Sequence, residues 1–404
     1  FARDGQKLWI GKNNTWLNSG NPSSGTNPLL TNIDTKSNWK MGVYSVSTGT
    51  AGASHTFIAN TGQRTFSYTP PTGFSAWNQD NLPETDRGVS GLVWNKNRDS
   101  TYNHGWWDSS RGRFLFISSN TTTVEQTALN GTTKFLKGGY TVGAGGGGNN
   151  LGDSIVAWNW VANGGTTTTN NNGSITSTTQ ANTTAGFSIV QYTGTGSNAT
   201  VGHSLSSAPE WILFKNLDNA SEGWSTYHTS LTSAAYIVTL NNSNAQASSA
   251  TDFNSTAPTS SVFSVGTNAR TNNSSQRIVA YCWHGVDGFS KFGKYTGNGS
   301  TDGTFVYTGF KPAWVLIKNI SGTYHWNLFD SARDTFNPVD RALAPSSTAV
   351  ETNFSTSEIF DFLSNGFKLR CTLGGENLSG NTYIYMAFAE HPFIGDGTSP
   401  VTAR

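Results

Sequence analysis

Charged residues, cysteine and long apolar runs are all scarce in this sequence of 404 residues. Charged residues make up 12% of it, against roughly 25% in typical soluble proteins. The net charge of +1 provides no general attraction to nucleic acid or to an anionic membrane, so we expect no nucleic-acid partner. No run approaches the ~20 apolar residues of a membrane-spanning helix, and we expect no membrane insertion.

Residues that bind metals or carry out catalysis are also sparse. The seven histidines show no metal-ligand spacing, no Asp-x-Asp-x-Asp-Gly run exists, and no pair of acids, Gly-x-Ser-x-Gly element or Cys/His dyad is evident. We therefore predict no metal, no cofactor and no enzymatic activity. The two cysteines, Cys282 and Cys371, are predicted to be buried thiols, and the alternative is a disulfide between them.

The sequence is rich in turn residues and aromatic residues. It has 45 Gly, 14 Trp, 13 Tyr and 23 Phe, and Ser, Thr and Asn replace the missing charges. Few helix formers, many β-formers and dense turn residues predict an all-β fold.

Three segments share one order of landmarks. An apolar run ending in Lys-Asn occurs in each, with the Lys-Asn pairs beginning at residues 96, 215 and 318, and each segment ends in a second apolar run near residues 154–158, 277–281 and 383–388. The interval is too long for a solenoid coil. We predict tandem β-sandwich or jelly-roll-like repeats at 87–160, 186–287 and 288–393, a low-complexity linker at 161–185 (or a β-arm against a neighbouring subunit), a first domain at 1–86 and a tail at 394–404.

Two local signals refine these repeats. Asn365-Gly366, between two apolar runs, predicts a tight hairpin, and Ser355-Thr356-Ser357-Glu358 before it has the form of a capping box. The first repeat lacks the Tyr-Thr-Gly opening of the other two. Because the chain begins with Phe in a strand-like pattern, we expect it to start inside a longer polypeptide.

The polar residues that recur with the repeats are the candidate site residues. For Lys96, Lys215 and Lys318 we favour a structural role, in which the adjacent Asn bonds its own backbone and the lysine lies in water. For the Asp-x-x-Arg spacing we favour an exposed or half-buried ion pair that ties a turn. The alternative is sugar binding by aromatic faces and polar groups. The residues that carry this alternative are Trp106, Trp107, Asp108, Arg111, Trp326, Asp330 and Arg333.

Two resemblances cover much of the chain. Residues 1–86, with Leu8-Trp9 and the Lys12-Asn13-Asn14 turn, resemble the C-terminal half of a SPRY-type β-sandwich. The whole chain resembles a family of phage structural proteins, often from marine phages, that pair a SPRY-like domain with repeated β-domains. The motifs that carry the second resemblance are 66–74 (FSYTPPTGF), 173–177 (GSITS), 185–190 (AGFSIV), 295–299 (YTGNG), 337–340 (NPVD) and 387–393 (AFAEHPF).

The resemblance implies an extracellular virion protein, most often a tail fibre or appendage. It implies a homotrimer that contacts other virion proteins and a host surface glycan or protein, and it implies no catalytic residues. The alternatives are a purely structural subunit, such as a head fibre, capsid decoration or filament, and a secreted lectin or glycan-active enzyme.

Overall fold

The chain forms two compact units, Phe1–Pro83 and Glu84–Arg404. The computed structural model describes residues 2–4, 6–32, 68–74, 91–136, 139–162, 166–354 and 359–391. The predictions for 355–358 and 394–404 lie outside the described residues. Within them the chain is all-β, as the composition predicts, with only single-turn helices.

The described part of the N-terminal unit consists of short hairpins. Its elements are β1 Ala2–Asp4, β2 Lys7–Trp9, β3 Gly11–Lys12, β4 Thr15–Trp16 and the 3-10 turns η1 Leu17–Ser19 and η2 Pro22–Ser24. Asn13 and Asn14 join β3 to β4 with φ of 50° and 62°, which asparagine tolerates better than most residues. The predicted tight turn is therefore present, and the SPRY-like interpretation of residues 1–86 stays a prediction.

The C-terminal unit repeats one order of three strands three times. In repeat 1 the strands run in the order β11-β5-β6-β7-β8. Their bounds are β5 Gly91–Asn97, β6 Gly105–Asp108, β7 Leu115–Ser118, β8 Gln126–Thr127 and β11 Ile155–Val161. The apolar run that ends in Lys-Asn is thus a central strand, paired on one side with the last strand of its repeat and on the other with the strand that follows it.

Repeats 2 and 3 share the first three strands of this order and add a strand beside the last strand of the repeat. Their orders are β14-β21-β16-β17-β18-β19 and β22-β30-β24-β25. The bounds are β14 Phe187–Thr193, β16 Trp211–Asn216, β17 Ser225–His228, β18 Tyr236–Thr239, β19 Ala247–Ser248, β21 Arg277–Trp283, β22 Ser290–Thr296, β24 Pro312–Asn319, β25 Asn327–Asp330 and β30 Thr382–Ala389. Strands β14 and β22, which carry the Tyr-Thr-Gly opening, have no counterpart among the described strands of repeat 1.

A second, smaller sheet covers each main sheet. These sheets are β9-β10, β15-β20 and β23-β29-β28. The predicted hairpin joins β28 to β29, but its turn is Ser364-Asn365, one residue earlier than predicted, and Gly366 begins β29. The remaining bounds are β9 Thr132–Leu136, β10 Gly139–Val142, α1 Gly146–Asn149, β15 Ala199–Gly202, β20 Val262–Val265, α2 Ala269–Asn272, β23 Phe305–Tyr307, β26 Arg341–Ala342, β27 Thr352–Asn353, β28 Phe360–Leu363 and β29 Gly366–Leu369. Repeats 2 and 3 each enclose an apolar core of their own, which buries Cys282 and Cys371 as free thiols.

Residues 161–185, predicted to be a linker, instead extend the main sheet of repeat 2. They contribute β12 Thr168–Asn170 and the whole of β13 Ser177–Asn182, and β13 pairs with β14 of the same chain. Threonine is β-branched and fits a strand, and the pattern of alternate buried positions around Thr179 is that of a strand. Gln180 accepts hydrogen bonds from Ser109 and Ser110 of repeat 1. The segment is therefore part of the fold.

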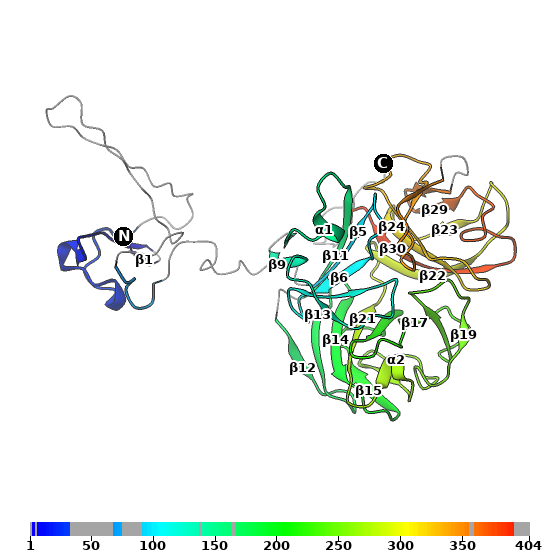
Figure 1. Cartoon of the computed structure of the whole chain (residues 1–404), viewed down its shortest axis with the longest axis horizontal. Helices are drawn as coiled ribbons and strands as arrows, with labels where there is room; N and C mark the ends of the chain where they lie inside the picture. The colour runs from blue at the N-terminus through cyan, green and yellow to red at the C-terminus, as the bar shows by residue number, and fades with distance from the viewer. Residues whose placement is uncertain are drawn as a thin grey trace. The chain divides into compact units, whose positions relative to one another are not determined.

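The three repeats share a central core as well. In Figure 1 repeat 1 (cyan), repeat 2 (green) and repeat 3 (yellow to red) surround this region. Trp160 of β11 shows how it is built: its ring lies 6.4 Å from that of Trp94 in repeat 1, 6.0 Å from Trp283 in repeat 2 and 5.5 Å from Trp314 in repeat 3. Residues 84–404 therefore form one compact unit in which no repeat is packed independently of the others.

The shared core predicts that one tryptophan supports all three repeats. Trp160→Ala should lower the free energy of unfolding by ~3–5 kcal/mol, the usual cost of truncating a buried aromatic, while unfolding stays a single transition. Urea denaturation followed by tryptophan fluorescence and circular dichroism measures both. Leu151→Ala, at a side chain that is 99% exposed, is the control. Loss of one repeat while the other two stay folded would contradict the shared core.

Candidate functional site

The Lys-Asn ends of β5, β16 and β24 form contacts between repeats. The backbone amide of Glu125 in repeat 1 donates to the carbonyl of Leu217, which follows the Lys-Asn pair of repeat 2, at 2.9 Å. The amide of Gln246 in repeat 2 donates to the carbonyl of Ile320 in repeat 3, at 3.1 Å. The amide of Glu351 donates to Arg98 at 2.9 Å and so returns from repeat 3 to repeat 1. Three equivalent contacts therefore close the repeats into a ring.

The lysines of the Lys-Asn pairs are buried at these contacts. Lys215 Nζ donates to the Thr122 carbonyl of repeat 1 at 3.1 Å, and Lys318 Nζ to the Ser243 carbonyl of repeat 2 at 2.9 Å. Burial lowers the pKa of Lys215 to about 8 and that of Lys318 to about 7. The expectation that these lysines lie in water is therefore wrong, because the loop of the preceding repeat covers them. Lys96 is buried as well.

The asparagines behave as the sequence predicts. Asn97 Oδ1 accepts from the amides of Asp99 and Ser100 at 3.0 and 2.9 Å, and Asn216 and Asn319 make the same pair of bonds. Each asparagine thus ties the turn that follows its strand.

The Asp-x-x-Arg elements lie at the same contacts. Asp108 Oδ1 accepts from the amides of Ser110 and Arg111 and Oδ2 pairs with the guanidinium of Arg111, which also binds Glu125 at 3.1 Å. Tyr281 of repeat 2 donates to Asp108 at 2.7 Å. The ion pair ties a turn, as predicted, but it is buried, because a second repeat packs over it.

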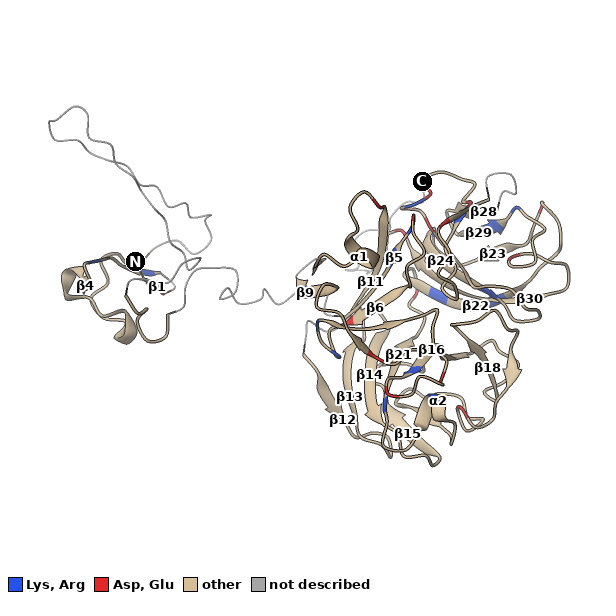
Figure 2. Ribbon diagram, in the orientation of Figure 1, with Lys and Arg blue, Asp and Glu red and all other residues tan. Residues whose placement is uncertain are grey.

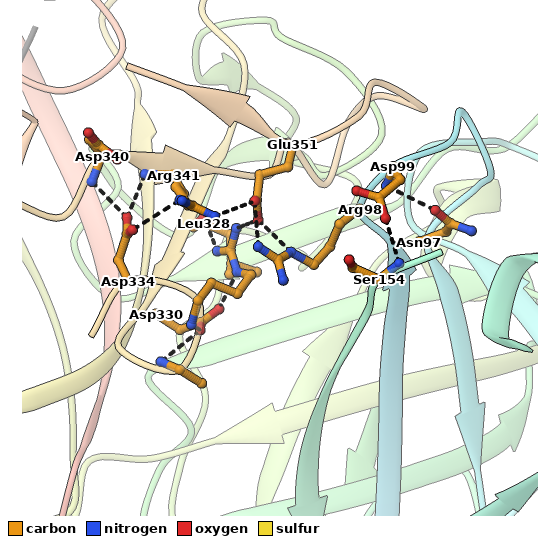
Figure 3. Close-up of polar contacts among 12 residues, drawn as sticks. Asn97, Arg98, Asp99, Ser154, Leu328, Asp330, Asp334, Asp340, Arg341 and Glu351 are labelled. Carbon is orange, nitrogen blue, oxygen red and sulfur yellow. Dashed lines mark hydrogen bonds and ion pairs between the residues drawn. The ribbon is translucent and has the colours of Figure 1, made fainter. Parts of the chain in front are cut away.

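The same network closes repeat 3 onto repeat 1 (Figure 3). Arg333 pairs with Asp330 at 2.6 Å and with Glu351 at 2.8 Å. Arg98 of repeat 1 donates to both carboxylate oxygens of Glu351, at 2.9 and 2.7 Å. Trp158 of repeat 1 donates to the carboxylate of Asp330 at 3.0 Å. Burial works to raise the pKa of Glu351, but the hydrogen bonds from Arg98 and Arg333 outweigh it and hold this pKa below its ordinary value.

Repeat 2 replaces the whole charged set. His228 pairs with Trp211 in the register in which Asp330 pairs with Trp314, and Leu231 and Gln246 stand where the other repeats have Arg and Glu. Burial lowers the pKa of His228 to about 3, so it is neutral at physiological pH. A buried charge without a partner is costly, which explains why acid, base and second acid are absent together.

All seven residues proposed for sugar binding are therefore interior. None of Trp106, Trp107, Asp108, Arg111, Trp326, Asp330 and Arg333 is more than 9% exposed. Trp106 packs against Trp94, Trp224 and Tyr281, and Trp326 donates to the Thr239 carbonyl of repeat 2. A sugar has no free ring face to stack on at these positions.

An exposed aromatic surface lies instead on β23. Phe305 and Tyr307 are 44% and 59% exposed, whereas Val306 between them is buried. Lys291 Nζ of β22 lies 5.1 Å from the centre of the Tyr307 ring, and Phe305 pairs with Lys368 of β29. We call Phe305, Tyr307, Lys291 and Lys368 the β23 surface. Figure 2 shows basic residues in blue on β22 and β29.

Sequence reasoning missed the β23 surface for a physical reason. Phe305, Val306 and Tyr307 are all large and mainly apolar, so the sequence does not show which face of the strand is buried. In β23 the side chain of Val306 is buried in the core, so the two aromatic rings on either side of it face outward. Among the described residues, no group of three or more His, Cys, Asp or Glu could hold a metal ion, and no helix is long and apolar enough to span a membrane.

Glu351 predicts a pH dependence of stability. Because its pKa is lower in the folded chain, its stabilisation is present above the unfolded value of ~4.3 and is lost as the pH falls through the folded value. Glu351→Gln should lower stability at pH 7 by about 2 kcal/mol, since hydrogen bonds to charged groups contribute ~1.5–3 kcal/mol each, and the difference from wild type should shrink below pH 4.

Thermal denaturation between pH 3 and 8 measures this difference. Asp302→Asn is the matched control, because its carboxylate also pairs with a base but its side chain is 84% exposed, where such pairs contribute little. Equal effects of the two substitutions would show that the Glu351 contact does not hold the repeats together.

Comparison with known proteins gave one match. A family model for DUF7483, a domain of unknown function, matches residues 85–392. Neither the curated proteins nor the solved structures gave a match. The matched segment covers nearly the same residues as the C-terminal unit, Glu84–Arg404, so the family model treats the three repeats as one domain. The match spans most of the sequence, and the chain belongs to the DUF7483 family.

Proposed function

We propose that this chain is a structural protein of a phage virion, a tail fibre or appendage subunit that binds a glycan or protein on the host surface. The proposal combines the resemblance of the sequence motifs with one observation, the β23 surface. It places the protein outside the cell, on the virion.

The chemistry of the β23 surface favours a glycan. Aromatic rings with a free face offer a large apolar contact at low entropic cost, and the C–H face of a sugar ring is their natural partner. Lys291 lies beside the Tyr307 ring and can donate to hydroxyl or carboxylate oxygens. Lys368, which pairs with Asp302 at 2.5 Å, has further N–H groups that can do the same. Two exposed rings on one strand with lysines beside them form a patch, and a patch supports a binding role more than a single exposed ring does.

The closed ring of repeats supports the same proposal. It holds β22, β23 and β29 on a scaffold closed by backbone contacts between the repeats, so the binding surface is presented with little loss of entropy on binding. Several copies on one virion would multiply weak contacts through effective concentration.

A purely structural role is the second candidate. The observation that favours it is the burial of the recurring Lys, Asp and Arg residues, which serve contacts between repeats. A head fibre, capsid decoration or filament subunit needs such contacts and no ligand surface. A secreted lectin or glycan-active enzyme is the third and least supported candidate.

Replacement of one exposed ring tests the proposal. The purified full chain should bind a defined set of surface glycans on an array, and Tyr307→Ala should weaken that binding about tenfold, which corresponds to ~1.4 kcal/mol. Titration calorimetry with the best glycan measures the change.

Phe336→Ala is the control, because Phe336 is also an exposed aromatic, at 83%, but it lies outside the β23 surface. It should leave binding unchanged. A blank array, or equal losses for the two variants, would favour the structural role. Cleavage of the glycan would overturn both proposals in favour of an enzyme.

A further inference from the structure

In the part of the chain that the structure describes, strand β11 has an open edge where the other two repeats have a strand. In repeat 2, β21 pairs with β16 on one side and β14 on the other, and in repeat 3, β30 pairs with β24 and β22 in the same way. Among the described strands, β11 pairs with β5 alone. The added strand is antiparallel in both complete repeats.

The backbone of β11 presents free hydrogen-bonding groups at this edge. The amide of Arg98 donates to the Ser154 carbonyl. Because hydrogen-bonded pairs alternate along an antiparallel ladder, the backbone groups of Val156, Trp158 and Trp160 also face β5. The amides of Ile155, Ala157 and Asn159 therefore point away from β5. Within the described residues, no backbone group pairs with these three amides. The carbonyl of Val161, which also points outward, accepts from the Asn182 side chain.

The composition of β11 is unusual for an exposed edge. It is seven residues long, Ile-Val-Ala-Trp-Asn-Trp-Val, without a charge or a proline. The other outer strands of the three main sheets that the structure describes are shorter or charged: β8 and β19 have two residues, β12 has three, β25 has four, and β22 carries Lys291 and Lys294. Proteins protect long uncharged edges from pairing with other chains unless pairing is their role.

The described sequence upstream of β5 does not fill this edge. In repeats 2 and 3 the added strand lies upstream of the central strand. In repeat 1 the described upstream segment, residues 68–74, belongs to the N-terminal unit and forms a turn with Pro70 and Pro71, which lack the amide hydrogen that a ladder needs.

We propose that β11 of one chain pairs with β11 of a second copy, antiparallel and about a two-fold axis. An identical strand meets itself antiparallel across such an axis, in the relative direction that β14 and β22 have in the complete repeats, and the contact is self-complementary. The main sheet of repeat 1 then continues through the dimer. This assembly has two-fold symmetry, in contrast to the trimer that the resemblance implies, and it does not depend on the proposed host binding.

A charge placed on the edge tests the proposal. Asn159 is exposed, so Asn159→Lys keeps the chain folded but puts a charge on an edge strand that has none, which disfavours pairing with another strand. Light scattering should give about twice the chain mass for the wild type and a single chain mass for the variant. Gln126→Lys, on the opposite edge strand β8 of the same sheet, is the matched control and should stay dimeric.

Hydrogen exchange locates the contact. The amides of Ile155, Ala157 and Asn159 should exchange slowly in the wild type and at least tenfold faster in Asn159→Lys, while circular dichroism stays unchanged. A wild-type monomer, a trimer with fast exchange at these amides, or a dimer that survives Asn159→Lys would overturn the proposal. Slow exchange in a monomer would show that another part of the same chain covers the edge, and would overturn it as well.

Discussion

A charge removed from water must find its partners inside the protein, and the C-terminal unit depends on this constraint. Its recurring lysines, aspartates and arginines lie where one repeat covers the next. Each is satisfied by a group from the neighbouring repeat or from its own turn. Because Lys215, Lys318 and Glu351 have partners in two repeats, separating the repeats would leave polar groups buried without bonds or exposed without their packing. The ring is therefore held by its polar groups together with its shared tryptophan core.

Repeat 2 shows how this constraint limits variation. Its neutral His228, Leu231 and Gln246 stand where repeats 1 and 3 have Asp, Arg and Glu. Substitution of a single residue of this set would leave a buried charge without its counterion, whereas substitution of all three leaves no unpaired charge. Charged and neutral sets then serve the same architectural purpose, which argues that these positions were kept for packing, and it separates them from the exposed rings of β23.

The proposed roles use two surfaces that are not occupied by contacts between the repeats, the β23 surface and the β11 edge. The β23 surface presents aromatic rings beside lysines, a chemistry suited to a sugar or a protein surface. The β11 edge presents backbone groups, which suit a strand of another chain. One surface serves recognition and the other assembly, and their separation on different repeats allows both to be used at once.

The sequence by itself determined the all-β class, the tight turns at Asn13 and Asn365, the Asn-tied strand ends and the buried thiols, because each follows from local propensity or from a pattern along the chain. Tertiary structure decided the rest. The burial of Lys318 and Trp106, the outward direction of Phe305 and Tyr307, and the strands of 161–185 all depend on what packs against them. Contacts between residues far apart in sequence set that environment, and no local pattern encodes which face of a strand another repeat will cover.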